Sequence, residues 1–508
     1  MTKKSALLLF FVLLKFVLQF AVINPAYELH RDEFLHLDQG KHLAWGYLSV
    51  PPFTSWISWV ILHLGHSVFW VKFFPALFGA LTIVVVWKII EELKGNVFAL
   101  ILGSTAILFS ALLRINLLYQ PNSLDVLFWT LLYFTLVKYI HSENNNWLWA
   151  ASLVFGFGFL NKYTIAFLLL GILPALLLTE HRKVFANKTL YLSMALAVLI
   201  ISPNLIWQYR NSFPVIYHMQ LLAKTQLANV ERSGFLKEQL LFFFSSFFVL
   251  IAAIVSFFRF APFRTYRVIF WSYAFTLSLF VYFRAKGYYA IGLYPVLLAF
   301  GAVYLEHLTS KGWRKYLQPL LILLPVILFL PITRVALPID SPEEIARNGT
   351  RFKNLGLLRW EDGKDHILPQ DFADMLGWKE LAAKVDRVYD SIPDKTSAIV
   401  ICDNYGQAGA INYYSAHTTM QAVSLNADYI HWFPLDHEIR NVILVTEADD
   451  DDPQRKKEKP LFTSVYLSGQ IENRYAREQG THIYVLKKSK APVNTLIQGD
   501  INEREREQ

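Results

Sequence analysis

Two adjacent acids, Asp32 and Glu33, lie in a short polar stretch between two long apolar segments. A carboxylate can accept the proton of an attacking hydroxyl group, which is the task of a general base. Side chains at neighbouring positions of an extended or turning loop point apart, so one acid could carry out the chemistry while the other holds it in place. A solvated loop with no catalytic role explains the pair equally well, and the two residues alone do not decide the question.

Histidines surround this acidic pair. His30, Glu33, His36 and Asp38 are residue types that bind zinc and similar ions, and Glu33 and His36 are spaced as neighbours on a helix would be. No HExxH-like pairing is present, and histidines near lipid headgroups are often ordinary interface residues. A divalent metal held by His30, Glu33 and His36 is therefore one hypothesis, while the sequence as a whole requires no cofactor.

Further polar groups occur where other apolar segments begin or end. Asp125 opens an apolar segment, where an acid either favours the start of a helix or faces the same cavity as Asp32. Arg114, Lys162 and Lys286 are cations near such ends, and each could simply extend its side chain to the lipid headgroups. Three cations beside two acids instead predict a site for an anionic group such as phosphate.

Apolar helices must position these residues. The chain has 508 residues, of which 54% are hydrophobic and 16% aromatic, too apolar for a soluble protein of this size. A helix needs about 20 apolar residues to cross a hydrocarbon layer of about 30 Å. Candidate spans are 5–23, 67–92, 97–113, 122–140, 147–160, 163–179, 189–206, 238–258, 267–283, 288–307 and 316–333. The segment 54–64 is short and rich in Trp, which favours a helix lying in the interface.

The loop charges predict how these eleven spans are threaded. The basic N-terminus lacks a small-residue cleavage site, so we expect a retained first span that starts in the cytoplasm. The loops 181–188, 259–267 and 310–315 then lie inside, and all three are basic, as the positive-inside rule requires. Asp32 and Glu33 fall in an outer loop, 24–66. The net charge of +8 is thus explained by topology, and nucleic acid is not expected as a partner.

The composition changes after the last span. Residues 1–335 form the predicted membrane domain, and 336–508 are polar and charged like a soluble domain outside the membrane. Segments 398–405, 442–448 and 481–488 are predicted strands, and 408–416 a short helix, which together indicate an α/β domain. The charged tail at the C-terminal end is expected to be frayed. A single cysteine, Cys402, excludes an internal disulfide framework.

The order of several motifs resembles bacterial members of glycosyltransferase family 39, relatives of the protein O-mannosyltransferases and of the lipid A aminoarabinose transferase. The motifs are DE, GY and PP, followed by QPNSLDVLFW, GFLNKYT, SPNLIWQYRNSFPVIYH and KGYYAIGLYPVLLA. The resemblance covers residues 5–335. It implies a GT-C fold and transfer of a sugar from a polyprenyl-phosphate carrier to an acceptor on the outer side, with inversion.

The resemblance also implies roles for individual residues. Asp32 corresponds to the catalytic base of the family, Glu33 to the second acid of the pair, and Asp125 to a further acid of the outer cavity. Lys162 and Lys286 occupy motifs that contact the carrier phosphate, and we group Arg114 with them. The residues expected in the acceptor or sugar pocket are His36, Tyr47, Tyr288 and Tyr289. The histidines around the acidic pair depart from the family, which leaves the acceptor and any metal open.

Two alternatives belong to other functional classes. A transporter or flippase for a polyprenyl-linked sugar would also carry charged groups in its spans, but no inverted repeat is visible and the polar groups gather on one face. A membrane anchor for a working tail domain is the second alternative. The transferase interpretation predicts a polyprenyl-phosphate sugar donor, an acceptor that is a lipid, a glycan or a protein, and the bilayer as partners. A bacterial inner membrane, with the active face in the periplasm, is the expected location.

Overall fold

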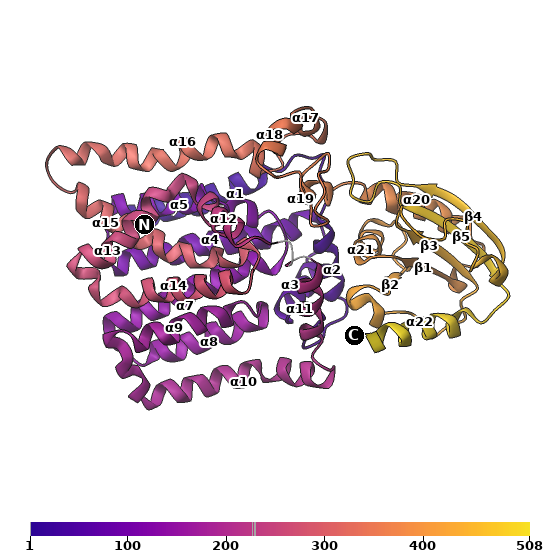
Figure 1. The fold of residues 1–508 in the computed structure, drawn as a ribbon, viewed down its shortest axis with the longest axis horizontal. Coiled ribbons are helices and arrows are strands. Elements are labelled where there is room, and N and C mark those ends of the chain that lie inside the picture. The colour runs from indigo at the N-terminus through magenta and orange to yellow at the C-terminus, as the bar shows by residue number, and fades with distance from the viewer. Residues whose placement is uncertain (1, 226, 228–229, 508) are drawn as a thin grey trace.

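A long block of helices and a smaller sheet domain make up the computed structural model, which describes residues 2–225, 227 and 230–507. Figure 1 shows the sheet domain at one end of the block, with α2, α3 and α11 at the junction. The helices of the block are α1 Lys3–Ala21, α2 Arg31–Gln39, α3 Phe53–His63, α4 Val68–Glu92, α5 Val97–Leu108, α6 Leu112–Ile115, α7 Pro121–Ser142, α8 Asn146–Asn161, α9 Ile165–Leu177, α10 Lys188–Arg210, α11 Pro214–Thr225, α12 Arg232–Phe242, α13 Phe247–Arg259, α14 Arg267–Tyr282, α15 Tyr294–Thr309 and α16 Gln318–Ala336. A short 3-10 helix, η5 Gly287–Leu293, leads into α15.

Every one of the eleven predicted spans contains a helix, but eleven crossings are not confirmed. Within the described residues, six helices are long and apolar enough to cross a membrane, or up to eight if each of two bent pairs is one span. The pairs Ile165–Leu177 with Glu180–Ala186 and Arg232–Phe242 with Phe244–Arg259 bend by 107° and 61°. α5 has 12 residues, which gives about 18 Å of helix, less than the hydrocarbon thickness of about 30 Å. The predicted helix at 54–64 is confirmed as α3, and its place in the membrane interface stays a prediction.

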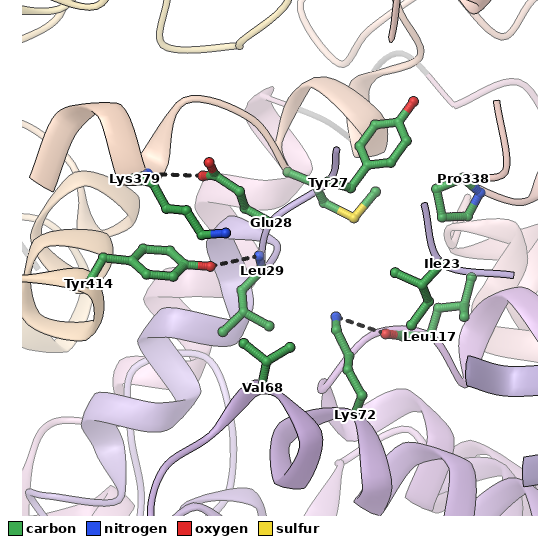
Figure 2. Close-up of a pocket in the computed structure, with 11 residues that line it drawn as sticks. Ile23, Tyr27, Glu28, Leu29, Val68, Lys72, Leu117, Pro338, Lys379 and Tyr414 are labelled. Atoms are coloured by element: carbon green, nitrogen blue, oxygen red, sulfur yellow. Dashed lines mark hydrogen bonds between the residues drawn. The ribbon is translucent and has the colours of Figure 1, made fainter. Parts of the chain in front are cut away.

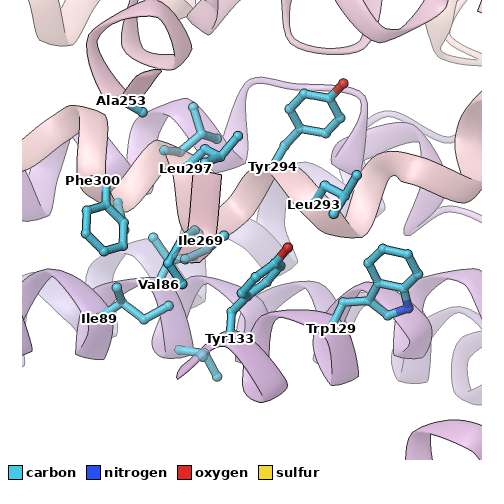
Figure 3. Packing of buried hydrophobic residues seen from close by; sticks show 14 of the residues in the cluster. Val86, Ile89, Trp129, Tyr133, Ala253, Ile269, Leu293, Tyr294, Leu297 and Phe300 are labelled. Carbon is cyan, nitrogen blue, oxygen red and sulfur yellow. The ribbon is translucent and has the colours of Figure 1, made fainter. Parts of the chain in front are cut away.

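The inner and outer helices of the block differ in how they use their apolar side chains. Figure 3 shows the inner packing, in which Trp129 and Tyr133 of α7 lie opposite α15 and its lead-in turn. Gly301 lets α15 approach α13 closely, because a Cβ atom there would collide with the carbonyl oxygen of Val249. In the segment Gly312–Ala336, which includes α16, only 11% of the most apolar stretch is buried, and Leu330 is 60% exposed. Such apolar exposure suits lipid, and together with the long helices it makes this a multi-pass membrane protein.

The C-terminal domain is built on a five-stranded mixed sheet. Its strands are β1 Ala398–Cys402, β2 Ala422–Ser424, β3 Asn441–Thr446, β4 Phe462–Gln470 and β5 His482–Ser489, in the order β2-β1-β3-β5-β4. β1 pairs in parallel with β2 and β3, while β5 pairs antiparallel with β3 and β4. The helices are α17 Pro342–Arg347, α18 Gly349–Asn354, α19 Gln370–Ala373, α20 Trp378–Asp390, α21 Tyr405–Tyr414 and α22 Val493–Glu507.

Alternating burial along the strands explains the two layers of helices. Val400 and Ile443 pack in the cluster that includes residues of α20 and α21, whereas Ile399 and Val442 pack in the cluster that includes α22. The predicted strands at 398–405, 442–448 and 481–488 correspond to β1, β3 and β5, and the predicted helix at 408–416 overlaps α21. The charged tail is helical through Glu507 rather than frayed, because Val493, Ile497 and Ile501 anchor α22 on the sheet. Gln508 lies outside the described residues.

Candidate active site

Asp32 and Glu33 lie on the first turn of α2 and not on an extended loop. His30 is the N-cap: its Nδ1 accepts a hydrogen bond from the backbone N–H of Asp32 at 3.2 Å. The carboxylate of Glu33 in turn accepts from the backbone N–H of His30 at 2.7 Å. This is a capping box in which a histidine takes the usual place of Ser or Thr. Acids on the first turn also suit the positive end of the helix dipole, so the local sequence itself starts the helix here.

Glu33 faces into the protein. Its side chain is fully buried, and Lys72 of α4 donates to both carboxylate oxygens at 2.7 and 2.8 Å. The backbone N–H of Tyr119 donates to the same carboxylate at 2.6 Å. With these partners and the N–H of His30, the carboxylate is fully occupied by protein donors. Glu33 therefore ties α2 to α4 and to the segment before α7, and it is a structural neighbour of the site.

Asp32 lies where the helical block meets the sheet domain, and it contacts residues of both. Its side chain is 36% exposed. The hydroxyl of Tyr405 donates to one carboxylate oxygen at 2.7 Å, and the amide of Gln120 donates to the other at 2.9 Å. Burial by itself would raise the pKa of Asp32, but the electrostatic influence of His30, the positive charge of Arg31 and the Tyr405 hydroxyl outweigh it and lower that pKa. Asp32 is thus an accessible carboxylate that is held in its ionised form.

A chain of amide side chains joins Asp32 to a lysine. Gln120 accepts at its Oε1 from the amide of Asn122 at 2.8 Å. Asn122 accepts at its Oδ1 from Nζ of Lys162 at 2.7 Å. Both amides belong to the QPN motif that opens α7, where Pro121 is the first helical residue and has no N–H to leave unpaired. The start of α7 therefore connects the acid of α2 to the cation between α8 and α9.

Lys162 is surrounded by aromatic rings. Its Nζ lies 4.5 Å from the ring centre of Tyr289 and 5.2 Å from that of Tyr288, which is cation–π geometry. Burial lowers the pKa of Lys162 to about 8; Asp125 opposes this shift, and the positive charge of Lys286 adds to it. Lys162 and Lys286 are therefore close enough to repel one another. An incoming anion would relieve that repulsion.

The other two predicted cations contact acids of the C-terminal domain. Nζ of Lys286 lies 2.8 Å from Glu361, and the guanidinium of Arg114 lies 2.9 Å from Asp371. Arg114 also lies over the ring of Phe372, 4.9 Å from its centre. The cations lower the pKa values of Glu361 and Asp371, although burial acts in the opposite direction and is the largest single effect on each.

Asp125 is buried beneath Lys162 and does not share an open face with Asp32. Its carboxylate accepts from the indole N–H of Trp129 at 3.0 Å and from the hydroxyl of Thr164 at 2.8 Å. Thr164 lies two residues after Lys162, so this acid fastens the α8–α9 turn to α7. Asp125 supports the position and the charge of Lys162.

His36 and Tyr47, expected in a substrate pocket, are buried within their own segment. Nδ1 of His36 lies 3.0 Å from Oε1 of Gln39, and the hydroxyl of Tyr47 donates to the carbonyl of Gln39 at 3.1 Å. Tyr288 and Tyr289 instead flank Lys162, as described above. Of the four predicted pocket residues, the structure thus brings two, Tyr288 and Tyr289, to Lys162. We call Lys162 and Lys286 the cation cluster.

The histidines and acids of α2 do not come together as a metal centre. Across residues 2–225, 227 and 230–507, no group of three or more His, Cys, Asp or Glu side chains is arranged to hold a metal ion. His30, Glu33 and His36 each have the protein partners named above. A requirement for a divalent metal stays a prediction for experiment.

A small cavity lies on the other side of the start of α2 (Figure 2). Its volume is about 100 Å³. The lining residues are Ile23, Tyr27, Glu28, Leu29, Val68, Lys72, Leu117, Pro338, Met375, Lys379 and Tyr414. Asp32, Lys162 and Lys286 are not among them. The candidate site is therefore defined by its hydrogen bonds and charges, and not by this cavity.

Several residues of the site were missed by sequence reasoning. Gln120 and Asn122 stand in the QPN motif, and a proline at the start of a predicted span could have directed attention to its polar neighbours. No local pattern marks Tyr405, Glu361 and Asp371. They belong to the C-terminal domain, and only the tertiary packing brings them to the site.

The chain is similar to known proteins in both sequence and fold. Residues 49–207 match the family model described as dolichyl-phosphate-mannose-protein mannosyltransferase. That region contains the QPN motif and Lys162 but begins after Asp32. A lipid A galacturonosyltransferase, RgtD of Rhizobium johnstonii, is 25% identical over 198 residues, which are 38% of this chain and 41% of the relative. The match thus spans less than half of that relative's length.

Two solved structures share the fold over almost the whole chain. ArnT from Cupriavidus metallidurans bound to undecaprenyl phosphate is 14% identical, with a TM-score of 0.63 over 95% of this chain and 98% of that one. The apo state of the same ArnT is 13% identical, with a TM-score of 0.60 over 97% and 99%. The comparisons confirm the resemblance to GT-C glycosyltransferases, and the fold is that of ArnT.

Proposed function

We propose that the chain is a membrane glycosyltransferase that moves a sugar from a polyprenyl-phosphate carrier to a hydroxyl group of an acceptor. The observation that carries this proposal is the hydrogen-bonded chain between an ionised, accessible carboxylate, Asp32, and a cation, Lys162. A proton acceptor and a phosphate-binding group joined in this way are the two groups that the reaction needs. The similarity to a lipid A galacturonosyltransferase and to ArnT bound to undecaprenyl phosphate supports the same class of donor.

In this reaction Asp32 acts as the general base. The acceptor hydroxyl loses its proton to the free lone pair of the carboxylate while its oxygen forms a bond to the anomeric carbon of the sugar. The bond between that carbon and the phosphate oxygen breaks, and the polyprenyl phosphate leaves with the electron pair. A single displacement of this kind inverts the configuration of the anomeric carbon and needs one base and no covalent intermediate.

The cations stabilise the leaving phosphate. Negative charge develops on the phosphate oxygen as the bond breaks, and positioned cations lower the energy of that state. Lys162 offers its ammonium group directly, while Lys286 and Arg114 exchange Glu361 and Asp371 for the phosphate when the donor arrives. Tyr288 and Tyr289 beside Lys162 contact the sugar.

The membrane arrangement belongs to the same proposal. Eleven crossings, with the N-terminus in the cytoplasm, place Asp32 and the C-terminal domain in the periplasm of a bacterial inner membrane. The basic loops 181–188, 259–267 and 310–315 support this orientation. The lipid tail of the donor then stays in hydrocarbon while its sugar meets an acceptor at the water-facing side.

The test is donor consumption by the purified protein. Polyprenyl phosphates carrying mannose, aminoarabinose or galacturonate are incubated with the protein in detergent and host membrane extract, and release of free polyprenyl phosphate is measured. Asp32→Asn should fold normally and lose about 10²- to 10⁴-fold in turnover, the usual contribution of a general base. Asp436→Asn, at a side chain that is 88% exposed, is the matched control.

The outcomes separate the candidate classes. Release by the wild type and by Asp436→Asn, but not by Asp32→Asn, supports the transferase and its base. Wild-type turnover in Asp32→Asn removes Asp32 from the mechanism. Passage of the intact donor across vesicles, without consumption, would favour the transporter.

A further inference from the structure

Helix α21 of the C-terminal domain packs directly on α2, the helix that carries the candidate base. Two glycines of α21 permit the approach. A Cβ atom at Gly409 would lie 2.6 Å from Cβ of Phe34, and one at Gly406 would lie 3.2 Å from Cβ of Arg31. The glycines and the residues that they face are both spaced three apart, so one side of α21 matches one side of α2. Separate mobility of the two domains would break this contact.

The first residue of α21, Tyr405, is held in place by a buried polar network. Asn404 is the N-cap, and its Oδ1 accepts from the N–H of Gln407 at 3.0 Å. The amide of Gln407 donates to Glu478 at 2.7 Å, and Thr481 donates to the same carboxylate at 3.2 Å. These residues lie beyond the carboxyl end of β1, where loops of parallel sheets commonly carry functional groups. The sheet domain therefore fixes the backbone position of Tyr405.

The side chain of Tyr405 then reaches the base itself. Its hydroxyl lies 2.7 Å from Asp32, and the guanidinium of Arg31 lies 4.5 Å from the centre of its ring. The ring is thus held on one side by a cation of α2 while its hydroxyl points at the neighbouring acid. Gln120 holds the second oxygen of the carboxylate at 2.9 Å. Two donors from different parts of the chain therefore define the orientation of this carboxylate.

We propose that Tyr405 is a positioning residue for the base, so that the C-terminal domain is an integral part of the catalytic site. The inference rests on the function proposed above. The Tyr405 hydroxyl keeps Asp32 in one rotamer and favours its ionised form, which leaves a lone pair of the carboxylate free for the acceptor hydroxyl. Without the sheet domain only Gln120 would hold the acid, which would then bind a proton more readily.

Several other charged or titratable groups act on Asp32, and the test must distinguish them from Tyr405. They are His30, Arg31 and His36 of α2 and its cap, Asp371 and Asp374 at α19, and Tyr288 of η5. Tyr405→Phe removes one oxygen atom and leaves all of these in place. Tyr413→Phe is the matched control, because that tyrosine lies on the same helix and donates to the carbonyl of His66 at 3.0 Å.

The experiment measures protonation of Asp32 directly. Infrared spectra of the purified full chain are recorded as a function of pH, and Asp32→Asn identifies the carboxyl band of Asp32. Tyr405→Phe should move the protonation midpoint of Asp32 to higher pH, and the acidic limb of turnover should move with it. Replacement of Tyr405 by 3-fluorotyrosine, whose hydroxyl is more acidic and a stronger donor, should move the midpoint the other way. Tyr413→Phe should leave it in place.

Each result decides the point. A midpoint that stays unchanged in Tyr405→Phe and with 3-fluorotyrosine overturns the positioning role, even if turnover falls. Shifts in opposite directions support it, since a merely structural residue would not respond to the acidity of its hydroxyl. The titration needs no donor, so failure of the proposed transferase reaction would be seen separately, as absence of polyprenyl-phosphate release. If Tyr405→Phe does not fold, the 3-fluorotyrosine protein alone decides the matter.

Discussion

Lys162 and Asp32 are joined by two amide side chains. The hydrogen bonds from Lys162 to Asn122, from Asn122 to Gln120 and from Gln120 to Asp32 measure 2.7, 2.8 and 2.9 Å. The first residues of α7 thus hold a cation and an accessible carboxylate in a fixed geometry relative to one another. Because the hydrogen bonds are continuous, a movement of Lys162 changes the position of Asp32, and the reverse is also true.

Gln120 tests this connection. Gln120→Leu keeps the size of the side chain but removes the donor to Asp32, a hydrogen bond to a charged group worth about 1.5–3 kcal/mol. We expect kcat to fall about 10- to 100-fold with little change in KM for the donor. Steady-state turnover checks this, with Gln498→Leu on the exposed face of α22 as control. Unchanged kcat would show that the hydrogen-bonded connection between Lys162 and Asp32 plays no part in catalysis.

The two lysines of the cation cluster should act on the donor. Lys162→Met and Lys286→Met each remove a positive charge but keep the apolar part of the side chain. We expect kcat/KM for the polyprenyl-phosphate donor to fall about 10- to 100-fold in each, the scale of one charge-assisted contact. Lys311→Met, in the exposed basic loop 310–315, should retain wild-type values. Equal kcat/KM in all three variants would place the phosphate elsewhere.

Glu33 and Lys72 should matter for stability more than for chemistry. Removing one partner of a buried pair leaves an uncompensated charge, which lowers the free energy of unfolding by about 3–5 kcal/mol. Thermal unfolding in detergent should therefore show large losses for Glu33→Gln and for Lys72→Met. The double variant should recover part of the loss, because neither charge is then left alone. A double variant that is as unstable as the sum of the two would argue against the pairing.

Gly409 should control the contact between α21 and α2. Gly409→Ala places a Cβ atom 2.6 Å from Phe34, so the helices must separate or Phe34 must move. Such overpacking lowers the free energy of unfolding by about 1–3 kcal/mol, and turnover should fall because Tyr405 is drawn away from Asp32. Gly499→Ala is the control, since nothing lies within 4 Å of that position. Unfolding and turnover would be measured on the same preparations.

The pH dependence of turnover follows from the lowered pKa of Asp32. The electrostatic influence of His30 and Arg31 and the hydroxyl of Tyr405 overcome the effect of burial, so Asp32 stays ionised below the usual aspartate pKa of about 3.9. The contribution of Asp32 to stability is therefore present above that value and is lost as the pH falls through its lowered pKa. We therefore expect that turnover measured between pH 5 and 7 shows no decrease caused by protonation of Asp32. An acidic limb in that range that is present in the wild type and disappears only in Asp32→Asn would contradict this assignment.

Local patterns in the sequence predicted a large part of the architecture. Apolar runs of sufficient length gave helices in all eleven expected places, because burial in lipid depends on composition along a single segment. Alternation and β-branched residues located β1, β3 and β5, whereas the three-residue β2 and the largely exposed β4 carry too weak a pattern. The DE pair and the lysines of GFLNKYT and KGYYAIGLYP marked the region of the site before its geometry was known.

The sequence by itself therefore determined which long apolar segments are helical, where the composition changes between the helical block and the C-terminal domain, and which charged residues are candidates for chemistry. Only the tertiary structure decided that Glu33 is buried against Lys72 while its neighbour Asp32 stays accessible. It alone brought Tyr405 to Asp32, across 373 positions of the chain. The reason is physical: hydropathy and periodicity act within one segment, but the direction of a side chain and its distant partners depend on how α2, α7 and α21 pack together.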